Sequence, residues 1–510
     1  MRRYDWANLT SRTMKIPRSA YNWISATGLI LALSCILLMI ILFVISLTVS
    51  GSNTYLGIFI YIVLPAVLVI GLILIPIGMM INLKKARRMP ETGLKWPVFD
   101  MNNQKHRRSV VIVSAFTLVF VLVSAMGSYQ AYNYTESVEF CGKLCHSVME
   151  PEYVTYLNSP HARVRCVECH VGEGASWYVK SKLSGLYQVY SVMFHKYSTP
   201  IPTPLENLRP ATETCEKCHW PQKFYERKLR NQRGFLSDSS NSHWNIAMMM
   251  KIGPSFSAYG LREGIHWHIN PDVSMEYVAS TADRETIPWI KLTNRKTGEI
   301  QVFQDKDNVL PAAAIDSLEK RSMDCMDCHN RPSHAYKSAN VYMDNALISG
   351  IVPEELPFIK KASMKILGNQ FSTVDSAMLG IRNGITEYYQ NKKPEVYAAH
   401  PDLIEKAITG IQGEFRKNTF PSMKASSSSY LNHIGHLESD GCFRCHSGRH
   451  VSESGKTISK DCNLCHTIIA QGSSEDFTTV SYLDTLEFRH PIDIGTAWQE
   501  VNCTECHRSM

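Results

Sequence analysis

The first 131 positions of the chain alternate between long apolar runs and short basic segments. No Asp, Glu, Lys or Arg occurs from Tyr21 to Leu83, where the polar sequence SGSNT separates two apolar runs, or from Ser109 to Ala131. Each run exceeds the roughly 20 residues that an α-helix needs to cross the hydrocarbon core of a bilayer. The pattern predicts three N-terminal transmembrane helices, two within residues 21–83 and one over residues 109–131.

The charges that flank these runs predict their orientation. Residues 1–20 hold five Lys or Arg and one acid, and residues 84–108 hold eight Lys or Arg and two acids. Because basic flanks stay on the cytoplasmic side of a membrane, we expect a cytoplasmic N-terminus (1–20), a cytoplasmic loop (84–108) and an outer location for everything after residue 131. The three predicted spans contain no histidine and no charged residue, so we expect neither haem nor a proton pathway within the bilayer.

The net charge of +7 arises from these membrane flanks. Residues 1–131 hold 13 of the 53 Lys and Arg but only 3 of the 46 Asp and Glu, which leaves 40 basic and 43 acidic residues beyond them. The outer part is therefore slightly acidic and lacks the basic patch that marks a nucleic-acid-binding domain. The expected partner is the lipid bilayer, and nucleic acid is not expected.

The outer part has local signals for both kinds of secondary structure. WIKLT and IQVFQ flank the turn sequence NRKTGE, which predicts a β-hairpin. PFIKKASMKILG, DSAMLGIRNGITEYY and PDLIEKAITGIQ have the periodicity of helices. We therefore expect a mainly α, loop-rich domain with a small β-hairpin element, joined to the three-helix membrane anchor.

The spacing of the cysteines predicts the chemistry of this domain. Six stretches match C-x-x-C-H, which attaches a c-type haem, and a seventh, CGKLCH, has one extra residue between its cysteines. The seven motifs use 14 of the 15 cysteines and leave Cys35: Cys141, Cys145, Cys166, Cys169, Cys215, Cys218, Cys325, Cys328, Cys442, Cys445, Cys462, Cys465, Cys503 and Cys506.

A histidine follows each second cysteine and is the expected proximal iron ligand: His146, His170, His219, His329, His446, His466 and His507. Paired C-x-x-C units also bind zinc, but zinc does not require a histidine at every one of these positions. The pattern predicts seven covalently bound haem c groups. Covalent attachment of haem also agrees with a domain on the periplasmic side of a bacterial inner membrane.

Residues outside the motifs are candidates for the sixth ligand of each iron. Bis-histidine haems transfer electrons readily and bind substrates poorly, which favours an electron relay over a terminal reductase. His195 and His400 are weaker candidates than the rest of the histidine pool. The candidate axial ligands are Met149, His161, His243, His266, His268, His334, His433, His436, His450 and His490.

Three features together resemble the NapC/NirT family of quinol-oxidising multihaem cytochromes. They are an apolar segment directly before the first motif, SPHARVRCVECHVGEGASWYVKSKLSG, and CFRCHSGRHVSESGKTISKDCNLCH. The seven motifs and three predicted spans are most similar to seven-haem inner-membrane cytochromes of metal-reducing bacteria. In this comparison residues 132–220 correspond to a family-like haem core with the first three motifs, and residues 221–510 form an extended domain with the other four.

The resemblance implies that menaquinol is oxidised beside the first haem and that periplasmic c-type cytochromes accept the electrons, in anaerobic or extracellular metal respiration. It implies a quinol-site lysine at Lys182, with Lys180 as a near alternative. The acidic residue that the family has a turn or two later is replaced here by Gln188, so Glu136 and Glu139 are the candidate proton acceptors.

The family also has a methionine iron ligand two residues after the first motif histidine, whereas Met149 follows His146 by three residues. Met149 is therefore a candidate ligand in a shifted register. Two other functions stay open: an anchoring electron-transfer subunit of a periplasmic reductase, and a terminal reductase of nitrite or sulfur oxyanions.

Overall fold

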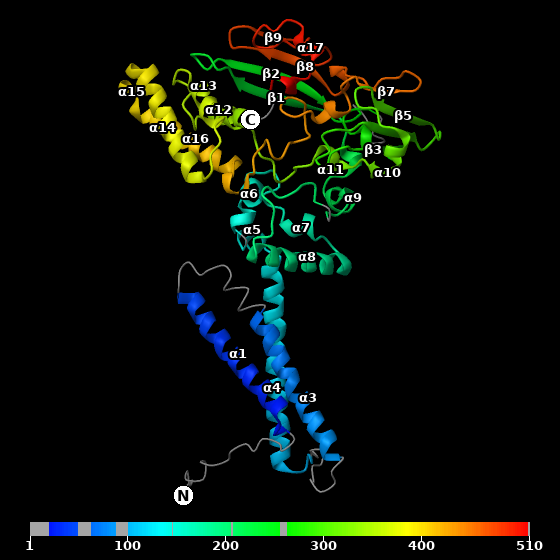
Figure 1. The fold of residues 1–510 in the computed structure, drawn as a ribbon, viewed down its shortest axis with the longest axis vertical. Helices are drawn as coiled ribbons and strands as arrows, with labels where there is room; N and C mark the ends of the chain where they lie inside the picture. The colour runs from blue at the N-terminus through cyan, green and yellow to red at the C-terminus, as the bar shows by residue number, and fades with distance from the viewer. Residues whose placement is uncertain are drawn as a thin grey trace. The chain divides into compact units, whose positions relative to one another are not determined.

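The computed structural model describes residues 20–48, 63–87, 100–144, 146–205, 208–254 and 263–507. The chain divides into two compact units, Met1–Leu144 and Cys145–Met510. Figure 1 colours the chain by residue number, from blue at the N-terminus to red at the C-terminus. The boundary between the two units falls inside the first cysteine motif.

The first unit consists of helices. They are α1 (Trp23–Thr48), α3 (Leu64–Arg87), α4 (Gln104–Thr135) and α5 (Val138–Lys143). Within the described residues, two segments are long and apolar enough to cross a membrane, Trp23–Leu42 and Leu64–Lys85. The third expected segment, residues 109–131, lies within the single helix α4, and its crossing of a bilayer stays a prediction.

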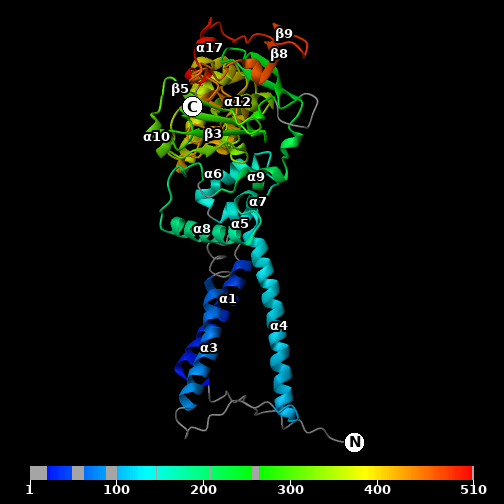
Figure 2. The same ribbon diagram turned by 90° about the vertical axis from the view of Figure 1, so that its right-hand side faces the viewer.

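Small residues let α1 and α3 pack closely (Figure 2). A Cβ atom at Gly28 would lie 2.6 Å from the carbonyl oxygen of Gly71, so only glycine allows this approach. The Ser25 hydroxyl also donates a hydrogen bond of 2.9 Å to the Ile75 carbonyl. Small side chains and an interhelical hydrogen bond are typical of helix contacts in membranes. Cys35 is buried in this unit, as expected of a small apolar residue.

Five helices of the second unit pack around one hydrophobic core and lie together in Figure 1. The core contains the fully buried Ile381, Ile385, Tyr389 and Ile408. The three segments with helical periodicity correspond to α13, α14 and α16, which confirms those predictions. The five helices are α12 (Ala339–Ile348), α13 (Ile359–Leu367), α14 (Val374–Lys392), α15 (Pro394–Ala399) and α16 (Pro401–Asn418).

The other α-helices of this unit are shorter or lie closer to the cysteine motifs. Most of them precede or include a motif, so they position cysteines and histidines. They are α6 (His146–Leu157), α7 (Cys166–His170), α8 (Ala175–Met193), α9 (Ala211–Thr214), α10 (Ala312–Ser317), α11 (Cys325–Cys328) and α17 (Ala497–Glu500).

Two antiparallel sheets complete the second unit. One has the order β1 (Arg227–Phe235), β2 (His243–Lys251), β8 (His466–Gly472), β9 (Phe477–Thr479). The other has the order β6 (Arg321–Ser322), β3 (Val273–Val278), β4 (Trp289–Asn294), β5 (Ile300–Asp305), β7 (His450–Ser452).

Strands β4 and β5 pair antiparallel across the segment where the sequence predicts a hairpin. The remaining strands make the domain richer in sheet than the sequence predicts. Strand β1 has the sequence RKLRNQRGF and β2 the sequence HWNIAMMMK. Neither alternates apolar and polar residues, which is the sequence signal of a half-buried strand.

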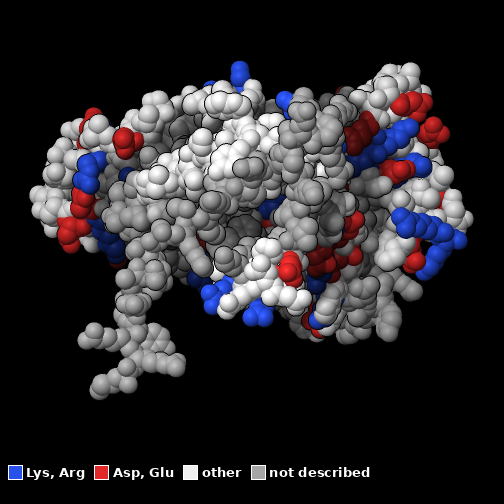
Figure 3. All heavy atoms as spheres, turned by 90° about the horizontal axis from the view of Figure 1, so that it is seen from below, with Lys and Arg blue, Asp and Glu red and all other residues white. Residues whose placement is uncertain are grey.

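A buried ion pair joins the helical core to the first sheet. The Lys360 ammonium on α13 donates to the Asp344 carboxylate on α12 and to the Phe235 carbonyl at the end of β1, both at 2.5 Å. Lys360 is only 5% exposed, so its charge depends on these two acceptors. On the surface, acidic and basic side chains lie interspersed at both sides of the face in Figure 3.

Candidate haem sites

The cysteine motifs from the second to the seventh form short helical turns. The backbone N–H of the motif histidine donates to the carbonyl of the first motif cysteine at His219, His329, His446 and His507, over 2.8 to 3.0 Å. This turn brings the two thiols and the imidazole of a motif to one short segment of chain. We number the sites 1 to 7 in the chain order of their motifs.

Six motif histidines each lie opposite a histidine from outside the motifs. The rings approach over similar distances although the partners are far apart in the sequence. The centroid separations are 6.3 Å for His170 and His334 (site 2), 6.0 Å for His219 and His161 (site 3), 6.3 Å for His329 and His266 (site 4), 5.8 Å for His446 and His268 (site 5), 6.2 Å for His466 and His436 (site 6), and 5.9 Å for His507 and His490 (site 7).

These separations fit two imidazoles on opposite sides of one iron. A histidine nitrogen binds a transition metal at about 2 Å and lies about 1.1 Å from its ring centroid, so two opposed rings have centroids about 6 Å apart. The stacked rings of His436 and Phe443 lie closer, at 4.3 Å. The six pairs therefore have room for a metal between their rings. They differ from other ring pairs of similar separation, such as Tyr187 and Tyr190 at 6.2 Å, in that both rings are imidazoles and one belongs to a cysteine motif.

The hydrogen bonds of the imidazoles also suit iron binding. The Nδ1–H groups of His161, His266, His268 and His334 donate to the backbone carbonyls of Pro332, Ile252, Ile265 and Glu152 over 2.9 to 3.1 Å. His446 likewise donates from Nδ1 to the Ser459 carbonyl. A carbonyl accepts but does not donate, so Nε2 of each ring carries the free lone pair that binds a metal.

Burial favours the neutral form of many of these rings. Desolvation lowers the pKa of His170 and the pKa of His436 to about 4. It also lowers the pKa values of His266, His268, His329, His446, His466 and His507. Neutral imidazole is the form that coordinates iron.

None of the described motif cysteines forms a disulfide, and a thiol is the group that attaches to haem c. Among the described residues, no three or more His, Cys, Asp or Glu side chains form a group that could hold a metal ion directly. Pairs of imidazoles, each beside two thiols, fit the requirements of haem c.

Three other candidate histidines have protein partners of their own. His450 lies fully buried in β7, where its Nε2–H donates to the Ile287 carbonyl at 2.7 Å. In His433, Nδ1 lies 3.0 Å from the Asp327 carbonyl and Nε2 lies 2.7 Å from a Glu285 carboxylate oxygen. The His243 Nε2 lies 3.1 Å from the Glu354 carboxylate.

Sites 2, 3 and 4 share one segment of chain. His334, the partner of the site 2 histidine, follows the site 4 motif by only five residues. The partner of the site 3 histidine, His161, bonds to the Pro332 carbonyl in the same segment. Residues 330–334 therefore contact ligand candidates of sites 2 and 3, and they directly follow the motif of site 4.

Sites 4 to 7 are linked in the same way. His266 and His268, two residues apart, face sites 4 and 5, and Arg444 of the site 5 motif donates to the Asp327 carbonyl of the site 4 motif at 2.7 Å. Phe443 of the site 5 motif stacks on His436 of site 6. The His436 Nδ1 in turn lies 3.8 Å from the site 7 Cys503 sulfur. The six sites thus form a continuous series in chain order.

The first motif is described only in part. Cys141 lies in α5 and His146 begins α6, whereas Cys145 lies outside the described residues. Met149 is part of α6 and is half-buried. The ligand set of site 1 stays a prediction from the sequence.

The quinol-site candidates lie on helices. On α8, the Lys182 ammonium lies 4.9 Å from the centre of the Tyr178 ring, and Gln188 donates to the Ser184 hydroxyl at 3.5 Å. At the end of α4, Glu136 is a buried carboxylate. Glu139 is exposed in the first turn of α5.

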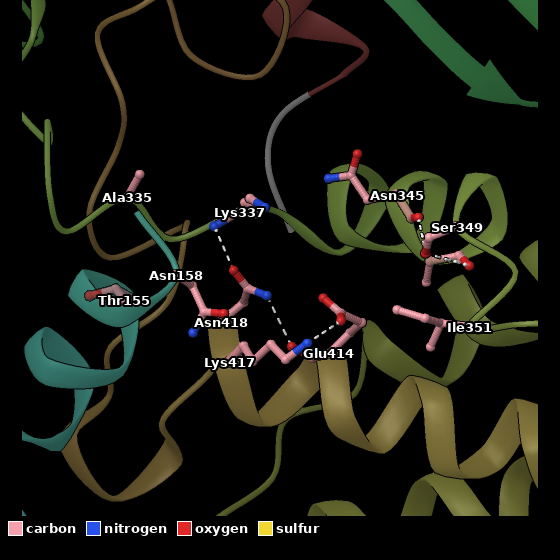
Figure 4. Close-up of a pocket in the computed structure, with 11 residues that line it drawn as sticks. Thr155, Asn158, Ala335, Lys337, Asn345, Ser349, Ile351, Glu414, Lys417 and Asn418 are labelled. Atoms are coloured by element: carbon pink, nitrogen blue, oxygen red, sulfur yellow. Dashed lines mark hydrogen bonds and ion pairs between the residues drawn. The ribbon is translucent and has the colours of Figure 1, made fainter. Parts of the chain in front are cut away.

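The cavity in Figure 4 lies between α6, α12 and α16 and has a volume of about 250 Å³. Its wall contains an ion pair of 2.6 Å between Lys417 and Glu414, and Asn418 accepts from the Lys337 backbone N–H at 3.1 Å. The lining contains no motif cysteine and no histidine, so this cavity is separate from the paired imidazoles.

The motifs, thiols and opposed imidazoles define a multihaem c-type cytochrome, and the comparisons agree. The family model described as "NapC/NirT cytochrome c family, N-terminal region" matches residues 103–204. The chain belongs to this family, whose members bind haem c covalently. It is 41% identical over 489 residues to the cytochrome c-type protein ImcH of Geobacter sulfurreducens, a match that covers 96% of this chain and 95% of the relative. No solved structure matches.

Proposed function

We propose that the chain is a quinol dehydrogenase of the bacterial inner membrane, with three spans and a cytoplasmic N-terminus. It oxidises menaquinol at the periplasmic surface and relays the electrons through seven haem c groups to periplasmic c-type cytochromes. Bound haem c supplies one-electron oxidation and reduction. The protein supplies ligands, spacing and a site for quinol.

The observation that carries this proposal is the set of six histidine pairs. If both imidazoles of a pair held one haem iron, no position would be left for a substrate, so a pair at each of sites 2 to 7 suits electron transfer better than chemistry on a bound substrate. The shared segments between neighbouring sites support the same function, because they hold the six sites as one series.

We assign the site that accepts electrons from quinol to the first motif. It is the nearest motif in sequence to the apolar helices, with Met149 and His146 as its ligand candidates. Lys182 would hold a quinol oxygen by a hydrogen bond or charge. The buried Glu136 is the first candidate to receive the proton, with Glu139 the second.

Rapid mixing with a menaquinol analogue tests the proposal. The haem-loaded full chain in lipid nanodiscs is mixed anaerobically with the quinol while haem reduction is followed by absorbance. The wild type is expected to become reduced, and Lys182→Ala is expected to slow reduction about 100-fold, because one positioned donor contributes about that factor. Lys180→Ala tests the alternative lysine. The matched control is Lys196→Ala, an exposed lysine just beyond the same helix, which should react like the wild type.

Two results would contradict the proposal. One is the absence of haem reduction in the wild type by the quinol analogue. The other is rapid reoxidation of the dithionite-reduced protein by nitrite, hydroxylamine or a sulfur oxyanion, which would indicate a terminal reductase. A catalytic subunit that copurifies in stoichiometric amount would instead favour an anchoring electron-transfer subunit.

A further inference from the structure

Helix α8 presents an exposed apolar stripe. Six large side chains on it are between 48% and 68% exposed: Val179, Leu183, Leu186, Tyr187, Tyr190 and Met193. Their spacing of three and four residues places them on one helix face. We call these six residues the α8 stripe.

Two lysines border the α8 stripe on opposite sides. At about 100° per residue, the stripe covers about 120° of the helix circumference, and Lys180 and Lys182 each lie about 20° beyond one of its edges. The C-terminal end of the helix is anchored: Ser191 is buried, and Val192, on the side opposite the stripe, packs against the cluster that contains Tyr336 and Phe420. The six stripe residues stay exposed on the other side of this contact.

The charged residues of the chain segment that carries the α8 stripe all have one sign. Residues 174–205 contain no Asp or Glu, and their only Lys or Arg residues are Lys180, Lys182 and Lys196. A helix with an apolar face, tyrosines on that face and lysines along its borders has the composition of a helix that lies in a membrane interface. The lysines can extend past the apolar face to lipid phosphates.

We propose that the α8 stripe is a lipid-binding surface, in addition to the membrane-spanning helices. The occupant is the bilayer interface: acyl chains contact the stripe, and anionic headgroups contact the two bordering lysines. The chain already carries α1 and α3, which are long and apolar enough to cross a membrane, so a bilayer is available to α8. This inference does not depend on quinol oxidation.

Photolabelling in nanodiscs tests the proposal. The haem-loaded full chain is reconstituted with phosphatidylcholine, phosphatidylglycerol and a diazirine-bearing lipid, irradiated, and mapped by mass spectrometry. Adducts are expected within residues 179–193 and, as the internal positive control, within residues 23–42. Leu183→Glu/Leu186→Glu should reduce the adducts at 179–193 by about tenfold or more, because two charges would have to enter an apolar boundary.

The matched control is Leu379→Glu, since Leu379 is an equally exposed leucine on the surface of α14 (60% exposed); it should leave the labelling unchanged. An unaltered haem spectrum shows that each variant has folded. Adducts at 23–42 with none at 179–193 in the wild type would overturn the proposal even if the double variant failed to fold. Short amine-to-amine crosslinks between Lys180 or Lys182 of two chains, in place of lipid adducts, would identify a second copy as the occupant and also overturn it.

Discussion

Replacement of Asp327 tests how the protein holds the site 4 motif. This residue lies between the two cysteines of CMDCH and is 3% exposed. Its Oδ1 accepts from the Tyr277 hydroxyl at 2.6 Å, from Arg321 Nε at 2.6 Å and from Arg284 Nη1 at 3.2 Å. Its Oδ2 accepts from the Asp324 backbone N–H at 2.7 Å. One carboxylate therefore joins the motif to strands β3 and β6.

The structure gives the expected size of the effect. Loss of one partner of a buried ion pair costs about 3–5 kcal/mol, but the two guanidinium side chains are 26% and 23% exposed. Solvent therefore compensates part of the loss, and we expect Asp327→Ala to lower the free energy of unfolding by about 2–4 kcal/mol. Asp327→Asn keeps the shape of the side chain and one acceptor oxygen, and it should lower the free energy of unfolding by about 1–2 kcal/mol.

Denaturant titration of the solubilised haem-loaded protein, followed by circular dichroism and haem absorbance, measures the difference. The control is Asp316→Ala, which breaks an exposed ion pair of 2.9 Å with Lys320 and should cost about 0.5 kcal/mol or less. Equal unfolding midpoints for Asp327→Ala and Asp316→Ala would refute the reasoning.

Two further predictions concern the helical core and one axial ligand. Lys360→Met should destabilise the protein by about 3 kcal/mol, because it leaves the Asp344 carboxylate buried alone, and Lys360→Met/Asp344→Leu should recover most of that loss in the same titration; no recovery would contradict this. His334→Met should raise the reduction potential of one haem by on the order of 0.1 V in a spectroelectrochemical titration, whereas His243→Gln should leave all potentials unchanged. Equal shifts of the reduction potential in His334→Met and His243→Gln would exclude His334 as a ligand.

Chemistry that lies within a short stretch of chain was predictable from the sequence. A haem attachment motif needs two thiols and an imidazole within about five residues, so the pattern C-x-x-C-H identifies an attachment site without knowledge of the fold. The apolar helices and α13, α14 and α16 were predictable for a similar reason, because hydrophobic periodicity is a local property.

The partners of the motif histidines depend on tertiary contacts, and proximity in the sequence is a poor guide to them. His334 follows the site 4 motif closely, but its ring faces His170 of site 2. His450 follows His446 by four residues, but it lies in β7 and bonds to the Ile287 carbonyl. Sequence distance says nothing about these placements, because a strand or loop carries each ring to a different neighbour.

The α8 stripe could have been predicted from the sequence, since its apolar residues recur with helical spacing between two lysines. Most of the sheet was not, because β1 and β2 lack alternation of apolar and polar residues. Tertiary contacts, such as the pairing of β2 with β8, which begins at the site 6 motif histidine, stabilise strands that their own residues do not predict.

Near-infrared magnetic circular dichroism of the fully oxidised wild-type protein tests the central claim most directly, because its charge-transfer bands identify the axial ligands of low-spin haems. The six opposed pairs predict six bis-histidine haems, at sites 2 to 7, and one further haem at the first motif. Fewer than six bis-histidine haems, or high-spin signals from more than one haem, would contradict the account.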